Sequence, residues 1–423
     1  MKTPWTLRIA LVAGLAGWVQ AQDFTTYISI GDSQAAGFSS GALVDTDQAN
    51  SVPALLAKQG AAPDFQQPLI SEPGIPAQLA LQNLIPVVIG PKSASTGVPE
   101  NLLLARPYNN LAVPGATASD ALNDTGDPSA GGLAALILRG KGSQVAQGAF
   151  SRPTFITLWI GNNDVLAAAV RGQAIEGVTL TPVADFRATY TTIIAALKAT
   201  GAPIVAANLG DVTTIPFVTT IPPVVVNPNT NQPILVDGNP VPLIGPNGPL
   251  PPGTLVTLAA SSLLAQGIGI PTQVGGTGDP LPDEVILDAG EVAIIQDHVN
   301  NDNAAIADIC QKAGVPVVDL HAVLNEFSTT GRNVGGVQLS STFLTGGIFG
   351  YDGIHPTPLG YAVVANEFIN VINQNGGTLP LIDLSPFLGV GTASASSVRP
   401  RVEFSEAAYR SLLQVFPLVG RRR

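Results

Sequence analysis

Short apolar runs rich in β-branched residues alternate along this chain with segments of helical periodicity. Such alternation is typical of a parallel sheet whose two faces are covered by helices. The candidate strands are Thr26 to Ile30, Asn110 to Val113, Thr154 to Ile160, Ile204 to Asn208 and Val315 to Leu320. The sequence therefore predicts an α/β fold, in which residues that follow the strands meet at one edge of the sheet.

Three helices have clear signals between or after these strands. The first spans about Asp185 to Ala199, and the second spans about Ala289 to Lys312 and ends at Gly314. The third begins after Thr357, which can cap a helix, with Pro358 in the first turn, where a missing N–H costs nothing. Their spacing places helices around the predicted sheet.

The N-terminus has the pattern of a secretory signal peptide. Lys2 and Arg8 precede an uninterrupted small and apolar run over residues 9–19, and Val19 and Ala21 supply small side chains at a cleavage site. The run is too short to span a bilayer, and no long apolar stretch follows it. We therefore expect an exported protein without a membrane-spanning segment in its mature chain.

The rest of the chain is expected to form one domain with two long insertions and a tail. Neither insertion has enough apolar periodicity for a core of its own. The second is rich in proline and contains a predicted hairpin around Asp237 and Gly238. The predicted division is a signal peptide at 1–21, a domain at 22–377 with insertions at 39–106 and 211–288, and a C-terminal tail at 378–423 with a possible helix from Ser405 to Val415.

Charge and cysteine content exclude several classes of function. The mature chain has 17 basic and 30 acidic residues, a net charge of −13, which argues against a nucleic-acid partner. Cys310 is the single cysteine and is expected to be a buried free thiol. Asp45, Asp47 and Asn50 partly resemble a calcium loop, but the spacing fails at the fifth position, so no metal site is predicted. No cofactor is expected either, and no pattern indicates an oligomeric state.

The stretch "YISIGDSQAAGF" ends a predicted strand on Ser33, which is either a helix cap or a nucleophile. A serine nucleophile needs a base, usually a histidine oriented by a carboxylate. His298 lies within a predicted helix, and nothing around His321 prepares it as a base. His355 follows Asp352 by three residues in "YDGIHPTPLGY", so in a tight turn Asp352 can reach Nδ1 and leave Nε2 to face a serine. A simple solvated turn is the alternative reading of this segment.

Acyl transfer also needs hydrogen-bond donors for the developing oxyanion. Gly115 follows the second predicted strand in "NLAVPGATASD", where backbone N–H groups can approach a substrate. Asn163 follows the third in "LWIGNNDV" and has a side-chain amide that can donate. Glycine and asparagine are common in such turns for conformational reasons alone.

In combination, these blocks resemble the SGNH hydrolases, or GDSL esterases and lipases. The matching blocks are Gly31-Asp32-Ser33 with Gly37, then Gly115, then Gly161-Asn162-Asn163-Asp164, then Asp352-Gly353-Ile354-His355-Pro356. The resemblance implies a three-layer α/β/α sandwich around a mostly parallel, five-stranded sheet of flavodoxin-like order. It makes Ser33 the nucleophile, His355 the general base and acid, and Asp352 the orienting acid. By the same resemblance, the N–H groups of Ser33 and Gly115 and the Asn163 side chain form the oxyanion hole. Gln34 departs from the family pattern, in which leucine is common at this position.

The expected function is that of an exported serine hydrolase acting on a small-molecule or lipid ester. One alternative is a carbohydrate O-acetyl esterase that uses the same site. Another is a surface-binding protein that retains a vestigial hydrolase core. The apolar runs at 224–226, 234–236 and 241–244 of the second insertion are expected to form a wall or lid for an acyl chain, which favours fatty-acyl esters.

Overall fold

The computed structural model describes residues 22–84, 86–228, 230–388, 401–416 and 418–419. The predicted signal peptide, residues 1–21, lies outside the described residues. The central sheet has the strand order β1-β4-β5-β12, and all of its pairings are parallel. Its strands are β1 (Tyr27–Gly31), β4 (Phe155–Trp159), β5 (Ile204–Ala207) and β12 (Val317–Val318). The predicted parallel α/β architecture is thus confirmed.

The second predicted strand, Asn110 to Val113, is reduced to a single parallel bridge between Asn110 and Ser29 on the free edge of β1. Leu111 donates its backbone N–H to Ser29 O at 2.9 Å, and Val113 donates to Gly31 O at 3.1 Å. The segment therefore takes the place of a strand beside β1 without a full ladder. Counted with it, the chain order across the sheet is 2-1-3-4-5, as in flavodoxin-like folds.

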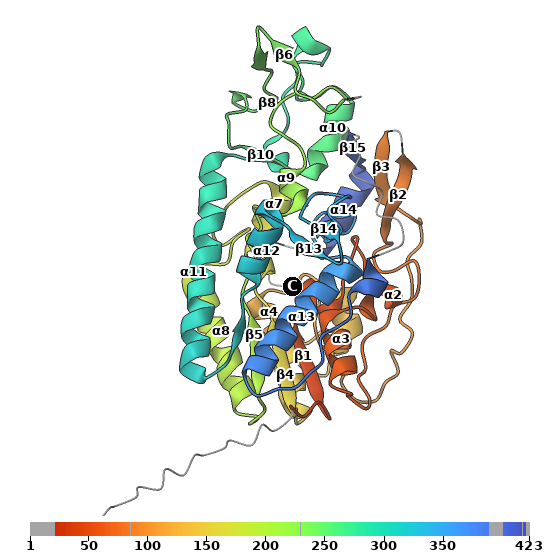
Figure 1. Ribbon diagram of the computed structural model, residues 1–423, viewed down its shortest axis with the longest axis vertical. Helices are drawn as coiled ribbons and strands as arrows, with labels where there is room; N and C mark the ends of the chain where they lie inside the picture. Colours follow the sequence, from red (N-terminus) through yellow and green to blue (C-terminus); the bar gives the residue numbers. More distant parts are fainter. Residues whose placement is uncertain (1–21, 85, 229, 389–400, 417, 420–423) are drawn as a thin grey trace, which may run out of the picture.

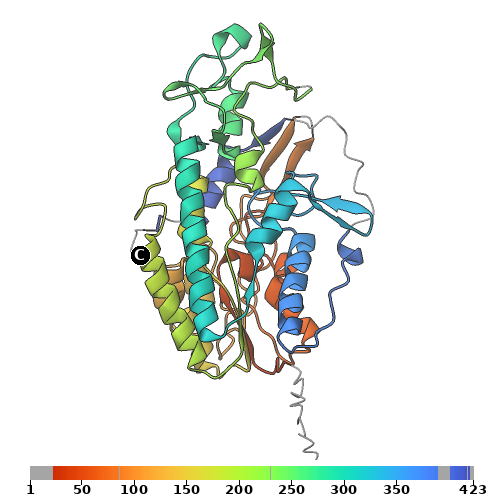
Figure 2. The same cartoon turned by 60° about the vertical axis from the view of Figure 1, so that its left-hand side comes forward.

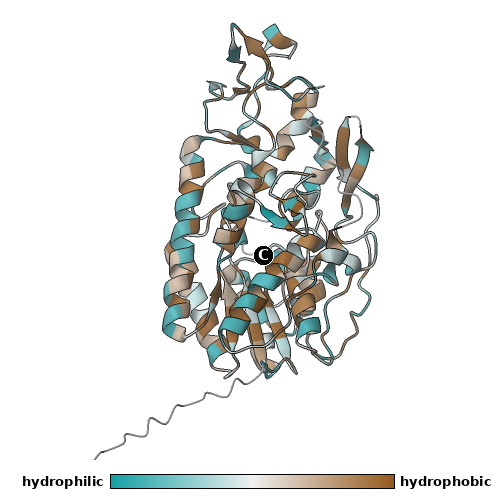
Figure 3. Ribbon diagram, viewed as in Figure 1, coloured by the Kyte–Doolittle hydropathy of each residue, from teal (hydrophilic) through white to brown (hydrophobic). Residues whose placement is uncertain are grey.

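Helices α8 (Val183–Lys198), α11 (Ala289–Ala313) and α13 (Pro358–Gln374) agree with the three predicted helices to within a few residues. Helix α11 is followed by Gly314 as predicted, and the left-handed backbone of this residue (φ 64°) suits a glycine. The Thr357 side chain caps α13 at the N–H of Gly360, with Pro358 in the first turn. Figure 3 shows hydrophilic and hydrophobic residues interspersed along both helices, as expected for helices with one buried side. The longer helices are α3 (Val52–Gln59), α7 (Asn163–Arg171), α8 (Val183–Lys198), α11 (Ala289–Ala313), α12 (Leu320–Thr329), α13 (Pro358–Gln374) and α14 (Glu406–Val415).

Helices cover both faces of the sheet. Gly148 in α6 (Gln144–Phe150) lies against Ile30 of β1. Gly31 comes directly after Ile30 and pairs with Trp159 of β4. The Trp159 ring packs against Phe368 of α13. Because successive strand residues point to opposite faces, α6 and α13 lie on opposite sides of the sheet. Helix α8 contacts α6 and α11 on one side, and α3 contacts α13 on the other, so the chain forms an α/β/α sandwich (Figures 1 and 2).

Shorter elements build the insertions. The predicted hairpin around Asp237 and Gly238 is present as β6 and β7, and it lies at the end of the molecule opposite β1 and β4 (Figure 1). The shorter helices are α1 (Ser33–Ala36), α2 (Asp45–Gln48), α4 (Ala118–Asn123), α5 (Gly132–Leu138), α9 (Pro216–Thr219) and α10 (Ser261–Ala265). The shorter strands are β2 (Leu79–Leu84), β3 (Val87–Pro91), β6 (Leu235–Val236), β7 (Asn239–Pro240), β8 (Ile244–Gly245), β9 (Gly248–Pro249), β10 (Leu255–Val256), β11 (Ile286–Leu287), β13 (Arg332–Val334) and β14 (Val337–Leu339).

The described C-terminal residues are part of the fold and not a detached tail. Strand β15 (Val402–Phe404) pairs in parallel with β3, so a three-stranded sheet β15-β3-β2 joins the end of the chain to the first insertion. The predicted helix near Ser405 is α14, capped by the Ser405 hydroxyl. Phe404, Leu412 and Phe416 are buried within the main hydrophobic core. In the described part of the chain, no helix is both long and apolar enough to cross a membrane.

Candidate active site

A tight turn at the end of β1 places Ser33. A Cβ atom on Gly31 would lie 2.5 Å from the carbonyl oxygen of Trp159, so the strands approach too closely there for any larger residue. Asp32 then caps α1 by accepting the N–H of Gln34 at 3.0 Å. Ser33 is the first residue of this helix, which leaves its own N–H without a helical acceptor.

A chain of hydrogen bonds joins the serine, histidine and aspartate that the sequence singles out. His355 Nε2 lies 2.9 Å from Ser33 Oγ, and His355 Nδ1 lies 2.8 Å from Asp352 Oδ2. All three side chains are buried. The turn before α13 therefore brings Asp352 and His355 to the serine more than 300 residues away, and the solvated-turn reading is wrong.

Backbone donors hold Asp352 in its ionised form. Its Oδ2 accepts the N–H of Gly41 at 2.7 Å, and its Oδ1 accepts the N–H groups of Ile354 and His355, each at 2.9 Å. Burial alone raises the pKa of such a carboxyl, but His355 and these donors more than offset burial and hold the pKa of Asp352 below its usual value. A carboxylate in this position orients the imidazole and stabilises its protonated form.

The three expected oxyanion donors lie at the carboxyl ends of β1, of the Asn110 segment and of β4. Gly115 has a left-handed backbone (φ 82°) in the turn closed by Ala116 N–H donating to Val113 O. Asn163 begins α7 and is buried, and its Nδ2 donates to Ala116 O at 2.9 Å. One amide proton of Asn163 is used in this bond, so the second is available for an oxyanion beside Gly115.

Two further carboxyls support the strand ends. Asp32 Oδ2 accepts from Asn162 Nδ2 at 2.9 Å, and burial raises the pKa of Asp32 to about 6. Asp164 accepts from the N–H of Ala118 and from the Thr181 hydroxyl, and burial raises the pKa of Asp164 to about 7. These bonds tie the turns after β1 and β4 to each other and to α4.

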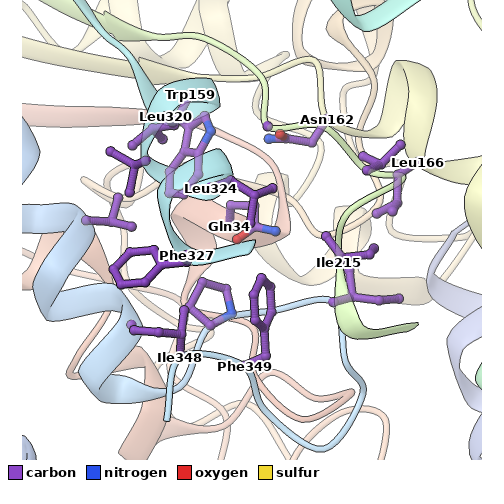
Figure 4. Close-up of a pocket in the computed structure, with 17 residues that line it drawn as sticks. Gln34, Trp159, Asn162, Leu166, Ile215, Leu320, Leu324, Phe327, Ile348 and Phe349 are labelled. Atoms are coloured by element: carbon purple, nitrogen blue, oxygen red, sulfur yellow. The ribbon is translucent and has the colours of Figure 1, made fainter. Parts of the chain in front are cut away.

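A largely apolar pocket of about 90 Å³ is lined by residues next to these groups in the chain, and not by Ser33, Asn163 or His355 themselves. Gln34 and Asn162, the neighbours of Ser33 and Asn163, line it, as do Ile354 and Pro356 on either side of His355. Apolar side chains make up most of the remaining wall, and Figure 4 shows Gln34 among them. The apolar side chains of this wall are Trp159, Leu166, Val212, Ile215, Leu320, Val323, Leu324, Phe327, Ile348, Phe349 and Val364.

The wall of this pocket differs from the expected one. Among the described residues of the second insertion, only Val212 and Ile215, at its start, line the pocket. The runs at 224–226, 234–236 and 241–244 do not, because they form the hairpin region at the far end of the molecule (Figure 1). Helix α12 and the loop before α13 take the place predicted for these runs.

The other candidates from the sequence lie elsewhere. His298 is buried in α11, and its Nε2 lies 3.8 Å from Oε2 of Glu176. His321 lies in the first turn of α12. Cys310 is a buried free thiol as predicted, and burial raises its pKa to about 11, which leaves it a poor nucleophile. The part of the chain that the structure describes contains no cluster of side chains suited to a metal ion.

Several residues of the site had no signal specific enough to be predicted. Asn162 stands next to Asn163 in the sequence, yet only the structure distinguishes their partners. Gly41 supports Asp352 from a loop 311 residues away. The rings of Phe38 and Phe416 both pack against His355. No local pattern marks any of these contacts.

The structure thus combines a parallel α/β/α sandwich with a serine, a histidine and an aspartate joined by hydrogen bonds next to the strand ends, the arrangement that the resemblance implied. The chain belongs to the family of GDSL-like lipases and acylhydrolases, whose family model matches residues 27–368. Members of this family are generally carboxylic ester hydrolases, which supports hydrolase activity for this chain.

Solved structures similar to this chain include esterases and lipases. Phospholipase A1 from Streptomyces albidoflavus NA297 is 14% identical, with 82% of this chain and 98% of that chain covered and a TM-score of 0.34. The extracellular lipase from Streptomyces rimosus is 13% identical, with the same coverages and a TM-score of 0.34. A catalytic mutant of Axe2, an acetylxylan esterase from Geobacillus stearothermophilus, is 12% identical, with coverages of 84% and 96% and a TM-score of 0.37. Among curated proteins, none matches the chain.

Proposed function

We propose that this protein is an exported serine hydrolase that cleaves carboxylic esters through an acyl-enzyme on Ser33. The observation that carries the proposal is the continuous hydrogen-bonded chain from Ser33 Oγ through His355 to Asp352. A serine hydroxyl becomes an effective nucleophile when an oriented base accepts its proton. The pattern of residues 1–21 is the basis for export.

In the proposed mechanism, Ser33 Oγ attacks the ester carbonyl carbon while His355 Nε2 accepts the hydroxyl proton. The negative charge that develops on the carbonyl oxygen is stabilised by the N–H groups of Ser33 and Gly115 and by the second amide proton of Asn163. Collapse of this intermediate breaks the bond to the alcohol oxygen, which takes the proton from His355 and leaves. Water then attacks the acyl-enzyme with His355 again as base, which releases the acid and regenerates Ser33.

The apolar pocket supports an acyl group as the part of the substrate bound beside Ser33. Its walls are mostly Leu, Ile, Val and Phe side chains, with few polar atoms to recognise a sugar. Such walls suit a hydrocarbon chain, whose removal from water is favourable in proportion to its buried area. We therefore favour fatty-acyl esters over acetylated carbohydrates as substrates.

Substitution of the nucleophile tests this function. Ser33→Ala should fold normally and lose turnover of 4-nitrophenyl esters, and a serine-directed phosphonate should label the wild-type chain at Ser33, as located by peptide mass spectrometry. Ser29→Ala is the matched control, because Ser29 is a buried serine of β1, the strand that leads to Ser33. Labelling at another serine, or full activity in Ser33→Ala, would refute the proposal.

A further inference from the structure

The end of the described chain covers the candidate base. The ring of Phe416 stacks on the imidazole of His355, with a centroid distance of 5.6 Å and an angle of 15° between the two planes. Phe38 packs against the same imidazole at 4.8 Å with a tilt of 60°. Phe416 is buried, with 1% of its surface exposed, and His355 is fully buried.

Several contacts hold Phe416 in this position. The guanidinium of Arg171, the last residue of α7, donates to Phe416 O at 2.9 Å. One helical turn before it, Leu412 is fully buried, and the Tyr409 hydroxyl donates to Val170 O at 3.2 Å. At the start of the segment, β15 is paired with β3. Residues 402–416, here called the C-terminal segment, are therefore a packed part of the fold.

This segment lies outside the part of the chain that the family model matches, which ends at residue 368. It reaches the site through the first insertion, because β15 pairs with β3, and through the second, because Phe404 N–H donates to the Ser261 hydroxyl of α10. The C-terminal segment thus packs against both insertions, and Figure 1 shows α10, β15 and β3 next to one another.

The hydrogen bonds of His355 leave one movement of its ring weakly restrained. The bond to Asp352 holds Nδ1, and the bond to Ser33 holds Nε2. Because each bond length depends on the position of one nitrogen, a rotation of the ring plane about the line through both nitrogens leaves the two lengths unchanged. A ring stacked nearly parallel to the imidazole opposes this rotation and also keeps water from that face of the ring.

We propose that Phe416 is a positioning residue for the hydrolytic reaction, which it serves by holding the His355 ring in the plane from which Nε2 accepts the Ser33 proton. The inference rests on the proposed function. It makes the C-terminal segment part of the catalytic apparatus through a contact with the base, without a contact to substrate. Stacked aromatic pairs contribute about 0.5–1.5 kcal/mol beyond their buried area, which corresponds to about 2- to 12-fold in rate.

Two matched substitutions test the inference in the full chain. Phe416→Leu removes the stacked ring, and Phe404→Leu removes a buried ring of the same segment that packs on Phe217 instead. Phe416→Met provides a second variant, because methionine fills irregular space and keeps folding comparable. The measurements are kcat and KM for 4-nitrophenyl acetate and the rate of inactivation by a small phosphonate, together with the melting temperature of each variant.

Phe416→Leu and Phe416→Met should lower kcat about 2- to 12-fold with KM within about twofold, and should slow inactivation by the same factor, because the same base takes the Ser33 proton in both reactions. Phe404→Leu should change the melting temperature but neither rate. Unchanged kcat in both Phe416 variants, or an equal loss of kcat in Phe404→Leu, would overturn the inference. A wild-type chain that hydrolyses no ester would instead refute the proposed function, so the two failures are distinguishable.

Discussion

Replacement of Asp302 by asparagine should stabilise the protein increasingly as the pH rises. Asp302 lies on α11 and is fully buried, and within the described part of the chain neither of its carboxyl oxygens has a hydrogen-bond partner. Burial, with a smaller contribution from the charge of Asp164, raises the pKa of Asp302 from 3.8 to about 8. Between these two pKa values, Asp302 therefore keeps its proton in the folded protein and releases it in the unfolded chain.

The sign and size of the effect follow from this difference. Below about pH 4 both states are protonated and Asp302 carries no penalty, whereas between about pH 4 and 8 the free energy of unfolding falls by about 1.4 kcal/mol per pH unit. At pH 7, about three of these units have been crossed, which gives a penalty of up to about 4 kcal/mol. Asparagine keeps the shape and does not titrate, so Asp302→Asn should regain this free energy at pH 7 and little at pH 4.

Urea unfolding of both proteins at several pH values between 4 and 8 measures the difference. The comparison must be between variant and wild type, because Asp32 and Asp164 also have raised pKa values and tilt both curves alike. Asp308→Asn on the same helix is a control of opposite sign, since bonds from Lys312 and Arg187 lower the pKa of Asp308. It should cost stability at neutral pH and less in acid. Parallel curves for Asp302→Asn and wild type would refute the reasoning.

Two further predictions concern the site. Asn163→Ala should lower kcat by about 100-fold or more with little change in KM, because the oxyanion exists only in the transition state, and steady-state kinetics with unchanged kcat would remove Asn163 from the oxyanion hole. Leu324→Phe should narrow the apolar pocket and lower the ratio of octanoyl to acetyl ester turnover, measured as kcat/KM, whereas an unaltered ratio would show that acyl chains bind elsewhere.

The residues of the candidate site could be predicted because their signals are local. Ser33, Gly115 and Asn163 each follow an apolar run, and parallel strands bring such positions to one edge of a sheet. The pair Asp352 and His355 is close in sequence, so its contact within one turn needed no knowledge of the fold. The limits of α11 and α13 were likewise readable from a glycine or a capping side chain near the helix ends, whereas α8 was readable from the spacing of its apolar side chains.

Predictions that depended on distant contacts were incomplete or wrong. The Asn110 segment has the residues of a strand, but it lies at the edge of the sheet and makes only one bridge to β1. The apolar runs of the second insertion look suited to an acyl chain, yet they form hairpins away from the pocket, and α12 supplies that wall. Apolar character does not identify the partner against which a segment packs, and Leu235 and Val236 of one such run are exposed.

The sequence by itself determined which side chains form the candidate site and which strand each of them follows. Strand periodicity, helix caps and short motifs act within a few residues, so they can be recognised without the fold. Only the tertiary structure decided what surrounds those groups. Gly41 beneath Asp352, the bond between Asn162 and Asp32, and Phe416 on His355 all join segments far apart in the chain. Such contacts are selected by the packing of the whole molecule, since burial rewards any apolar surface and is not specific to a partner.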